Sequence, residues 1–165
     1  MNRRQALSSL AVAGTISLGG CSSVLGSEGI VLGKIEVINS SFVANRINLM
    51  VQRDEEVLLN RKITLPGIDA ENGTPATLIP PMWSEKKGAY TVTAIHYDTS
   101  GNRESGKYEY TFTRKDYDAY YGDDHEDPGC LGAVVKIGSL SDSENAAVGI
   151  GPTYMKNPCG TADSE

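Results

Sequence analysis

The sequence lacks the signals of several common protein classes. It has no apolar run of about eighteen residues and a mean hydropathy of −0.27, which together exclude a polytopic membrane protein. Basic residues are too few for a nucleic-acid-binding surface: 15 Lys and Arg face 21 Asp and Glu, and the net charge of −6 repels a phosphate backbone. No repeat of about 20–50 residues indicates a propeller or a solenoid. The length of 165 residues fits one domain with terminal tails.

Signatures of catalysis are also missing. The chain has no G-x-S-x-G motif, and a proline rather than a helix start follows the G-x-G run at 149–151, so we expect no phosphate-binding loop. The two histidines, His96 and His125, have no serine or cysteine partner at a spacing that indicates a catalytic triad. We therefore expect no enzymatic activity, and an enzyme with an unrecognised site is the third of three functional interpretations.

The N-terminus has the composition of an export signal. Arg3 and Arg4 precede a moderately apolar segment without acidic residues, which is too short and too rich in Ser, Thr and Gly to span a membrane. The segment ends in Leu-Gly-Gly-Cys, the pattern of a lipobox, whose cysteine is lipidated and becomes N-terminal after cleavage. We predict an export signal with a lipobox over 1–20, lipidation at Cys21, and a lipidated tether over 21–33.

This head of the chain resembles the twin-arginine-exported surface lipoproteins of haloarchaea. The resemblance rests on residues 1–23, with the adjacent Arg3 and Arg4, and on the small acidic domain that follows. It implies an exported archaeal protein that lipid attaches to the outer face of the cytoplasmic membrane. A bacterial twin-arginine lipoprotein is the alternative, and Ala6 stands where the export motif usually has an aromatic residue. A core helix at the N-terminus would need a polar face, but no charge lies between Arg4 and Glu28.

The sequence has three cysteines, one in the lipobox and two near the C-terminus. Assigning Cys21 to the lipid leaves Cys130 and Cys159, and in an oxidising compartment we expect a disulfide between them. A bridge that closes a loop of this length contributes about 3.5 kcal/mol to stability by the loop-entropy estimate. A metal–thiolate or redox pair is the alternative, but the two cysteines lack C-x-x-C spacing and neighbouring histidines.

From Lys34 onward, apolar residues recur with a period of two, which indicates β-strands. The polar run 53–56 separates two such stretches and predicts a hairpin. The phrase Gly-Ala-Tyr-Thr-Val-Thr-Ala at 88–94 is similar to a late strand of many immunoglobulin-like domains. We predict an all-β fold over residues 34–159, an antiparallel β-sandwich (immunoglobulin-like or related) with about seven or eight short strands, and a disordered tail at 160–165. The positions expected to face the core include Ile35, Val37, Ile47, Leu49, Val51, Val57, Leu59, Ile63, Leu65, Tyr90, Val92, Ala94, Tyr108, Tyr110 and Phe112.

Acidic residues crowd the stretch 116–127, which its composition indicates to be a loop. Carboxylate oxygens are the ligands that Ca²⁺ prefers, and a histidine beside them can ligate a transition metal. The spacing lacks the order of a preformed calcium loop, so a solvated loop is the alternative. The candidate metal ligands are Asp118, Asp123, Asp124, His125, Glu126 and Asp127.

Three tyrosines in this stretch, Tyr117, Tyr120 and Tyr121, do not alternate with polar residues as strand tyrosines do. Because aromatic side chains are enriched at interfaces, we predict that these three form an exposed patch for another surface protein or a glycan. Two N-x-[ST] acceptors, at Asn39 and Asn72, lie in expected loops and are candidate glycosylation sites.

The leading functional interpretation joins these features. We expect a membrane-anchored extracytoplasmic lipoprotein whose sandwich domain is a binding or interaction module, without a cofactor and without nucleic acid as a partner. The second interpretation is a lipoprotein that binds a divalent cation such as Ca²⁺, or a small solute, through the acidic stretch 116–127.

Overall fold

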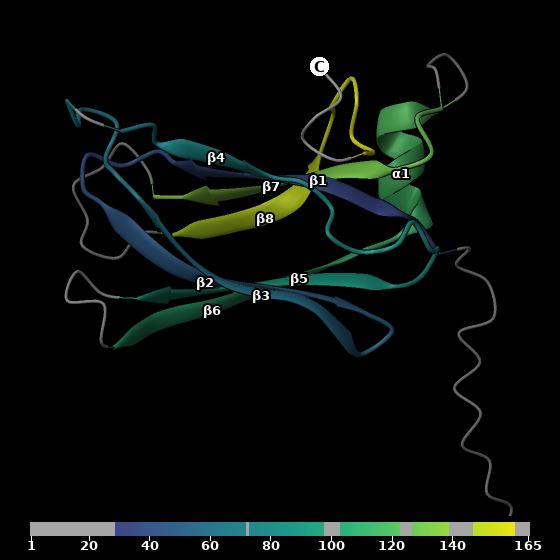
Figure 1. Ribbon diagram of the computed structural model, residues 1–165, viewed down its shortest axis with the longest axis horizontal. Coiled ribbons are helices and arrows are strands. Elements are labelled where there is room, and N and C mark those ends of the chain that lie inside the picture. Colours follow the sequence, from purple (N-terminus) through teal and green to yellow (C-terminus); the bar gives the residue numbers. More distant parts are fainter. Residues whose placement is uncertain (1–28, 72, 98–102, 123–126, 139–146, 161–165) are drawn as a thin grey trace, which may run out of the picture.

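The computed structural model describes residues 29–71, 73–97, 103–122, 127–138 and 147–160. The predicted export signal, the lipidated cysteine and nearly all of the predicted tail lie outside these residues. Within them, the chain forms eight strands and one short helix, and the strands make two sheets that pack face to face (Figure 1). The predicted all-β sandwich is therefore confirmed, including its number of strands.

Each sheet has four strands, and the chain crosses between the sheets several times. The strand order is β4-β1-β7-β8 in one sheet and β3-β2-β5-β6 in the other. All paired strands are antiparallel except β1 and β7, which run parallel. The elements are β1 (Leu32–Asn39), β2 (Asn45–Arg53), β3 (Glu56–Leu65), β4 (Ala76–Ile79), β5 (Tyr90–Tyr97), β6 (Glu104–Phe112), α1 (Arg114–Tyr121), β7 (Leu131–Ile137) and β8 (Val148–Thr153).

The core lies between the two sheets and is filled from alternate positions of the strands. In β2, Ile47, Leu49 and Val51 are fully buried, whereas the residues between them are half-buried. In β6, Phe112 is buried and Glu109 is exposed, as the alternation predicts. Burial of each large apolar side chain contributes about 1.5–3 kcal/mol, so this alternation determines which face of each strand packs inward.

The hairpin between β2 and β3 confirms the predicted turn and corrects one position. Asp54 and Glu55 adopt positive φ angles of 46° and 73°, as in a type I′ turn. The register then shifts, because Val51 faces Leu59 while the next residue of β2 faces Val57. This bulge moves Val57 to the outer face, where it is 52% exposed, so its predicted inward position is wrong.

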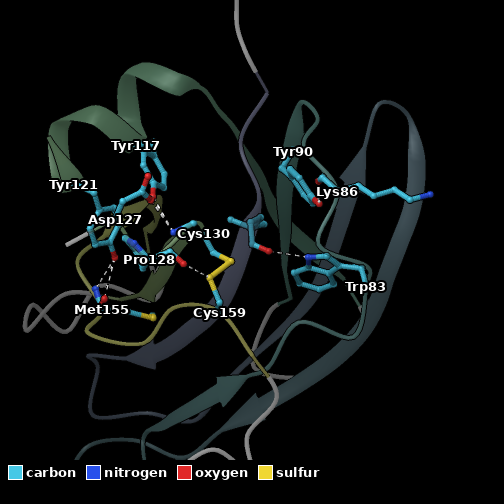
Figure 2. The surroundings of a disulfide bond; sticks show 12 residues. Trp83, Lys86, Tyr90, Tyr117, Tyr121, Asp127, Pro128, Cys130, Met155 and Cys159 are labelled. Atoms are coloured by element: carbon cyan, nitrogen blue, oxygen red, sulfur yellow. Dashed lines mark hydrogen bonds between the residues drawn. A yellow bond between two sulfur atoms is a disulfide. The ribbon is translucent and has the colours of Figure 1, made fainter. Parts of the chain in front are cut away.

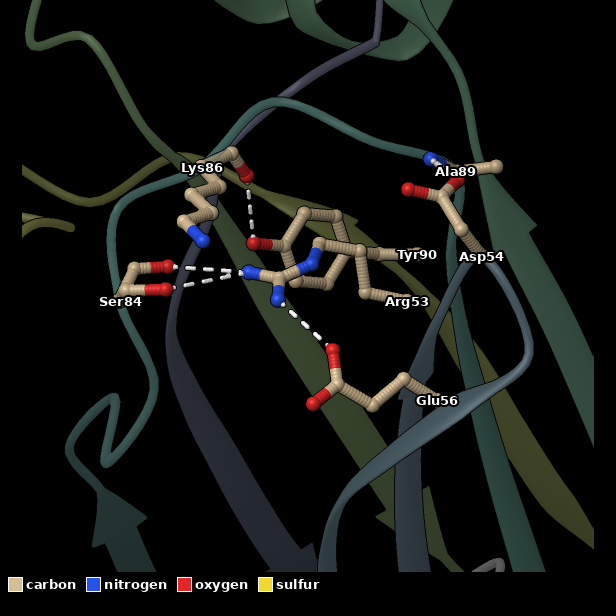
Figure 3. Close-up of polar contacts among 7 residues, drawn as sticks. All are labelled: Arg53, Asp54, Glu56, Ser84, Lys86, Ala89 and Tyr90. Atoms are coloured by element: carbon tan, nitrogen blue, oxygen red, sulfur yellow. Dashed lines mark hydrogen bonds and ion pairs between the residues drawn. The ribbon is translucent and has the colours of Figure 1, made fainter.

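A polar cluster holds the segment between β4 and β5 against this hairpin (Figure 3). The Arg53 guanidinium donates to the backbone oxygen and the hydroxyl of Ser84, at 3.3 Å each, and to Glu56 at 3.0 Å. The buried Tyr90 donates its hydroxyl to the Lys86 carbonyl at 2.7 Å. These bonds connect the crossover segment to the start of β5 and to the end of β2.

The helix α1 was not indicated by the sequence pattern, and the prediction of a loop from residue 116 onward is wrong as far as Tyr121. The Asp116 carboxylate accepts the N–H of Thr113 at 2.7 Å and its hydroxyl at 2.9 Å, which caps the first turn. Tyr117 and Tyr121, four residues apart, share the buried face of the helix. In the described part of the chain, no helix has the length and apolar composition to cross a membrane.

Candidate functional site at the open edge of the sandwich

The predicted aromatic patch is wrong for two of its three tyrosines. Tyr117 and Tyr121 are only 4% and 6% exposed, and Tyr120 is half-buried against the core. The Tyr121 hydroxyl donates to the carbonyl of Met155 at 3.0 Å and accepts its N–H at 3.1 Å (Figure 2). The Tyr117 hydroxyl donates to Asp127. These tyrosines therefore hold α1 against later segments and present no exposed patch.

The predicted disulfide between Cys130 and Cys159 is confirmed, with Cα atoms 5.4 Å apart (Figure 2). It joins the start of β7 to the segment that follows β8, and the Pro158 carbonyl in that segment accepts the N–H of Lys34 in β1 at 2.7 Å. Nearby, α1 contacts β8, and β8 also contacts β6 of the opposite sheet. We call this side of the sandwich, formed by β6, β8 and α1, the closed edge.

The described acidic residues of 116–127 do not converge. The Asp116 carboxylate accepts the Tyr110 hydroxyl at 2.7 Å, and the Asp118 carboxylate lies 2.7 Å from the Arg114 guanidinium. Asp127 accepts the Tyr117 hydroxyl and the N–H of Gly129. Each of these carboxylates therefore has its own partner, and the described residues form no group of three metal ligands. The other candidate ligands, Asp123, Asp124, His125 and Glu126, lie outside the described residues, so cation binding stays a prediction.

The hydrogen bonds to these carboxylates change the acidity of both partners. The bond to the Asp116 carboxylate, together with burial, raises the pKa of Tyr110 to about 12. Burial and the bond to Asp127 likewise raise the pKa of Tyr117 to about 12. The same bond, with the one from the Gly129 N–H, lowers the pKa of Asp127. Tyr110 with Asp116 and Tyr117 with Asp127 are therefore hydrogen-bonded pairs that stabilise the closed edge.

Asn39 is the last residue of β1 and is buried, so it does not lie in a loop as expected. The prediction of a glycosylation site at Asn39 is therefore wrong for the folded chain. The residue is 1% exposed. Its amide nitrogen donates to the carbonyls of Val43 at 2.8 Å and Pro66 at 2.7 Å, while its oxygen accepts the N–H and the hydroxyl of Ser41. No room is left for a glycan on that nitrogen. The other sequon residue, Asn72, lies outside the described residues.

The structure also brings together Asn45, His96 and Ser105, which sequence spacing did not connect. The Asn45 nitrogen donates to Ser41 at 2.7 Å and to Asn39 at 3.1 Å, which fixes its oxygen toward His96 Nε2 at 2.7 Å. That nitrogen therefore carries the histidine proton, and Nδ1 accepts the Ser105 hydroxyl.

The backbone and the burial of His96 both support this arrangement. Ser105 is the extra residue where the β5–β6 register shifts, and this bulge directs its side chain to the imidazole. His96 itself is 4% exposed, and its burial lowers its pKa, so the imidazole is neutral at neutral pH. Within the described residues, every buried side-chain polar atom has a hydrogen-bond partner. The network is therefore complete in the folded chain.

The opposite side of the sandwich differs from the closed edge. β3 and β4 are the edge strands of the two sheets on this side, and we call them the open edge. A groove of about 330 Å³ runs between them. Its lining residues are 61–66 from β3 and the residue after it, and Thr74, Ala76, Thr77 and Ile79 from β4 and the segment before it.

The groove is lined by both apolar and polar side chains, among them the cation Arg61. Its apolar lining residues Ile63, Leu65 and Ile79 are buried. Arg61 pairs in register with the fully buried Leu49, so its position belongs to the inner face of β3. Its side chain is nevertheless exposed, as β3 is an edge strand of its sheet.

Arg61 and its neighbour Lys62 are also unpaired. Among the described residues, neither has an ion-pair partner, whereas Lys107 on the closed edge lies 3.2 Å from Glu109. Lys86, Lys87 and Lys115 likewise have no ion-pair partner among the described residues, so Arg61 and Lys62 differ from them in lining the groove on an edge strand. Sequence analysis missed them, since an Arg-Lys pair within a strand pattern does not reveal that the strand lies at an edge. The available signal was the position of Arg61 two residues before Ile63, on the inward face.

No protein-family model matches the chain, and the search of curated proteins finds no match. The fold and the geometry of the open edge therefore carry the functional argument.

Proposed function

We propose that the protein is a lipid-anchored extracytoplasmic binding module, and that the open edge between β3 and β4 is its binding surface. The observation that carries the proposal is the groove of about 330 Å³, whose lining combines buried apolar side chains with two cations that have no ion-pair partner among the described residues. Ligand sites combine an apolar lining with a few polar groups, and the groove has both. The closed edge supplies no comparable surface in the described residues, because its tyrosines and carboxylates bond to one another.

Two features support the anchored, exported part of the proposal. The lipobox pattern ends at Cys21, and the disulfide between Cys130 and Cys159 suits an oxidising compartment. Gly29, the first described residue, lines a small pocket of about 70 Å³ together with Arg114 of α1. The described chain thus begins beside α1, on the closed edge.

Replacing the lipobox cysteine tests the anchor. Cys21→Ser removes the only sulfur that the lipobox offers for lipid, so we expect release of the protein into the medium or retention of the uncleaved precursor. Fractionation and intact mass measure both outcomes. Unchanged membrane association together with unchanged mass contradicts lipidation. Changing Arg3 and Arg4 to Lys tests the export route separately, and full-rate export would exclude the twin-arginine route.

Site-specific photo-crosslinking in native membranes tests the binding surface. A photoreactive residue replaces Thr64 at the groove in the full chain, and the matched control replaces Thr111, an exposed threonine of β6. We expect a discrete crosslinked product at 64 and none at 111, and we expect Thr77→Trp, which fills the groove, to remove the product. Equal products at both positions, or a product that survives Thr77→Trp, would contradict the proposal.

A second candidate is acyl transfer at Ser105, which the hydrogen bond from its hydroxyl to His96 favours. Ser105 Oγ would bond to the carbonyl carbon of an ester while its proton moves to His96 Nδ1 and then to the leaving alkoxide as the ester bond breaks. An alkyl fluorophosphonate, which reacts with activated serines, should label Ser105, and Ser105→Ala and His96→Gln should remove or slow the labelling. Absence of an adduct on Ser105 rules this candidate out.

A further inference from the structure

We infer that the open edge binds an extended acidic peptide segment of a partner protein, which adds to β3 as a new strand and places carboxylates on Arg61 and Lys62. The inference rests on the proposed function, because it specifies the ligand of the same groove.

The backbone of β3 is the part of the molecule best suited to strand addition. With ten residues it is the longest of the described strands, and it pairs on one side only, with β2. In an antiparallel pair, alternate residues of an edge strand direct their N–H and C=O groups away from the partner. Among the described residues, no further backbone bond outside the sheet involves residues 57–64. This row of groups can form a ladder with an added strand.

The other three edge strands each have a feature that limits strand addition, and for β6 of the same sheet this feature is its contact with β8 of the opposite sheet. β4 has only four residues and lies between Pro75 and Pro80. β8 contains Pro152, which has no N–H to donate, and it contacts both β6 and α1. Short edge strands, prolines and covering elements are the usual protections against pairing. β3 is long and contains no proline, and in the described part of the chain β2 is the only element with which it packs extensively.

The side chains of the groove define the pattern of the added strand. Arg61, Ile63 and Leu65 face inward at successive alternate positions, and Lys62 faces outward between the first two. An added strand in register alternates in the same way. Its inward side chains would be a carboxylate at Arg61 and apolar groups at Ile63 and Leu65, and a second carboxylate would face Lys62. The fitting segment therefore has two adjacent acidic residues beside alternating apolar residues. The acidic pair comes first in a segment that runs parallel to β3 and last in one that runs antiparallel.

Charge favours this occupant over a second copy of the chain. Arg46 pairs in register with Thr64 and donates to its hydroxyl, so a third cation lies beside Lys62 on the outer face. Two copies paired through β3 would bring these cations together and would repel each other. A carboxylate-bearing strand pairs with them and removes the like-charge repulsion among them.

Peptide titration of the mature full chain, held in detergent micelles and followed by amide NMR signals, tests the inference. The probes are two short synthetic peptides, one with two adjacent Asp before alternating Val and Thr and one with the same residues in reverse order, and the controls of each carry Asn or Lys at the two acidic positions. We expect one of the two Asp peptides to shift the signals of residues 57–65 and to bind about tenfold more tightly than its Asn control. That factor corresponds to two exposed ion pairs.

A charge-reversed protein provides the matched control. Arg61→Glu with Lys62→Glu should reverse the preference, so that the Lys peptide binds more tightly than the Asp peptide. Lys136→Glu, an exposed change of the same sign on β7 of the other sheet, should leave the preference unchanged. Far-ultraviolet circular dichroism verifies that each variant is folded.

The outcomes separate the inference from the proposed function. Equal binding of the Asp and Asn peptides at β3 overturns the acidic ligand and leaves the groove as a binding surface. Absence of peptide binding, with a crosslink at Thr64 that Thr77→Trp removes, overturns strand addition and again leaves the groove. Absence of both the peptide binding and the crosslink overturns the inference and the proposed function together.

Discussion

The two edges of the sandwich are covered in different ways. At the closed edge, α1, the disulfide and the hydroxyls of Tyr117 and Tyr121 join segments that are far apart in the sequence. At the open edge, β3 and β4 leave a groove between them, and Arg61 and Lys62 lie there without an ion-pair partner among the described residues. The residues that attract attention in the sequence thus stabilise the closed edge. The proposed binding surface consists of ordinary strand residues at an uncovered position.

The largest loss of stability that this comparison predicts comes from replacing Tyr121. Tyr121→Ala removes a buried ring and its two hydrogen bonds to Met155, so we expect the free energy of unfolding to fall by about 3–5 kcal/mol. Tyr120→Ala, on the half-buried side of α1, should cost about 1 kcal/mol. Urea denaturation of both variants measures the difference. Equal losses would mean that α1 does not pack through Tyr121 as described.

The disulfide is the next largest contribution at the closed edge. Replacing Cys130 and Cys159 by Ala should lower the free energy of unfolding by about 3.5 kcal/mol, because the bridge spans 29 positions of the chain and restricts the unfolded state. Reductant should destabilise the original chain by a similar amount and leave the double variant unaffected. A chain that is insensitive to reductant would contradict the bridge.

Much of the fold was predictable from the sequence because period-two alternation acts locally. It assigned Ile47, Leu49 and Val51 to the core correctly. The alternation placed Val57 on the wrong face. A bulge in the pairing of β2 with β3 shifts Val57 to the outer face, and a pattern within one strand does not show how that strand pairs with its neighbour. The parallel pairing of β1 with β7 was invisible for the same reason.

The candidate site was less predictable than the fold. The helix α1 had two local signals that composition obscured: Thr113 three residues before Asp116, and the spacing of four between Tyr117 and Tyr121. The open edge had almost no local sequence signal. Whether Arg61 meets solvent or another strand depends on sheet order, which is a property of the whole chain.

The pH dependence of stability provides a further test of the closed edge. There, His96 forms a hydrogen bond with Ser105, the extra residue in the bulge of β6. Burial lowers the pKa of His96 below the ordinary value of 6.5. Below that pH the unfolded chain binds a proton that the folded chain excludes, so the free energy of unfolding should fall as the pH is lowered from 7 toward 5. His96→Gln should flatten this slope. An NMR titration that gives a pKa of 6.5 or above for His96 would contradict the burial.

The smallest expected effect on stability is at the open edge. Arg61→Glu and Lys62→Glu change exposed side chains without ion-pair partners, so each should alter the free energy of unfolding by less than about 0.5 kcal/mol. Thermal and urea unfolding measure the change. A loss of several kcal/mol would show that these cations stabilise the fold, and would remove the contrast between the two edges.

Amide hydrogen exchange tests the contrast most directly. The full chain is measured in native membranes and again after purification away from its partners, and protection is compared between residues 57–64 of β3 and residues 104–112 of β6. If the open edge pairs with a partner chain as proposed, purification should reduce protection in β3 and leave β6 unchanged. Unchanged protection in β3, or a loss in β6 alone, would contradict the assignment of the open edge as the binding surface.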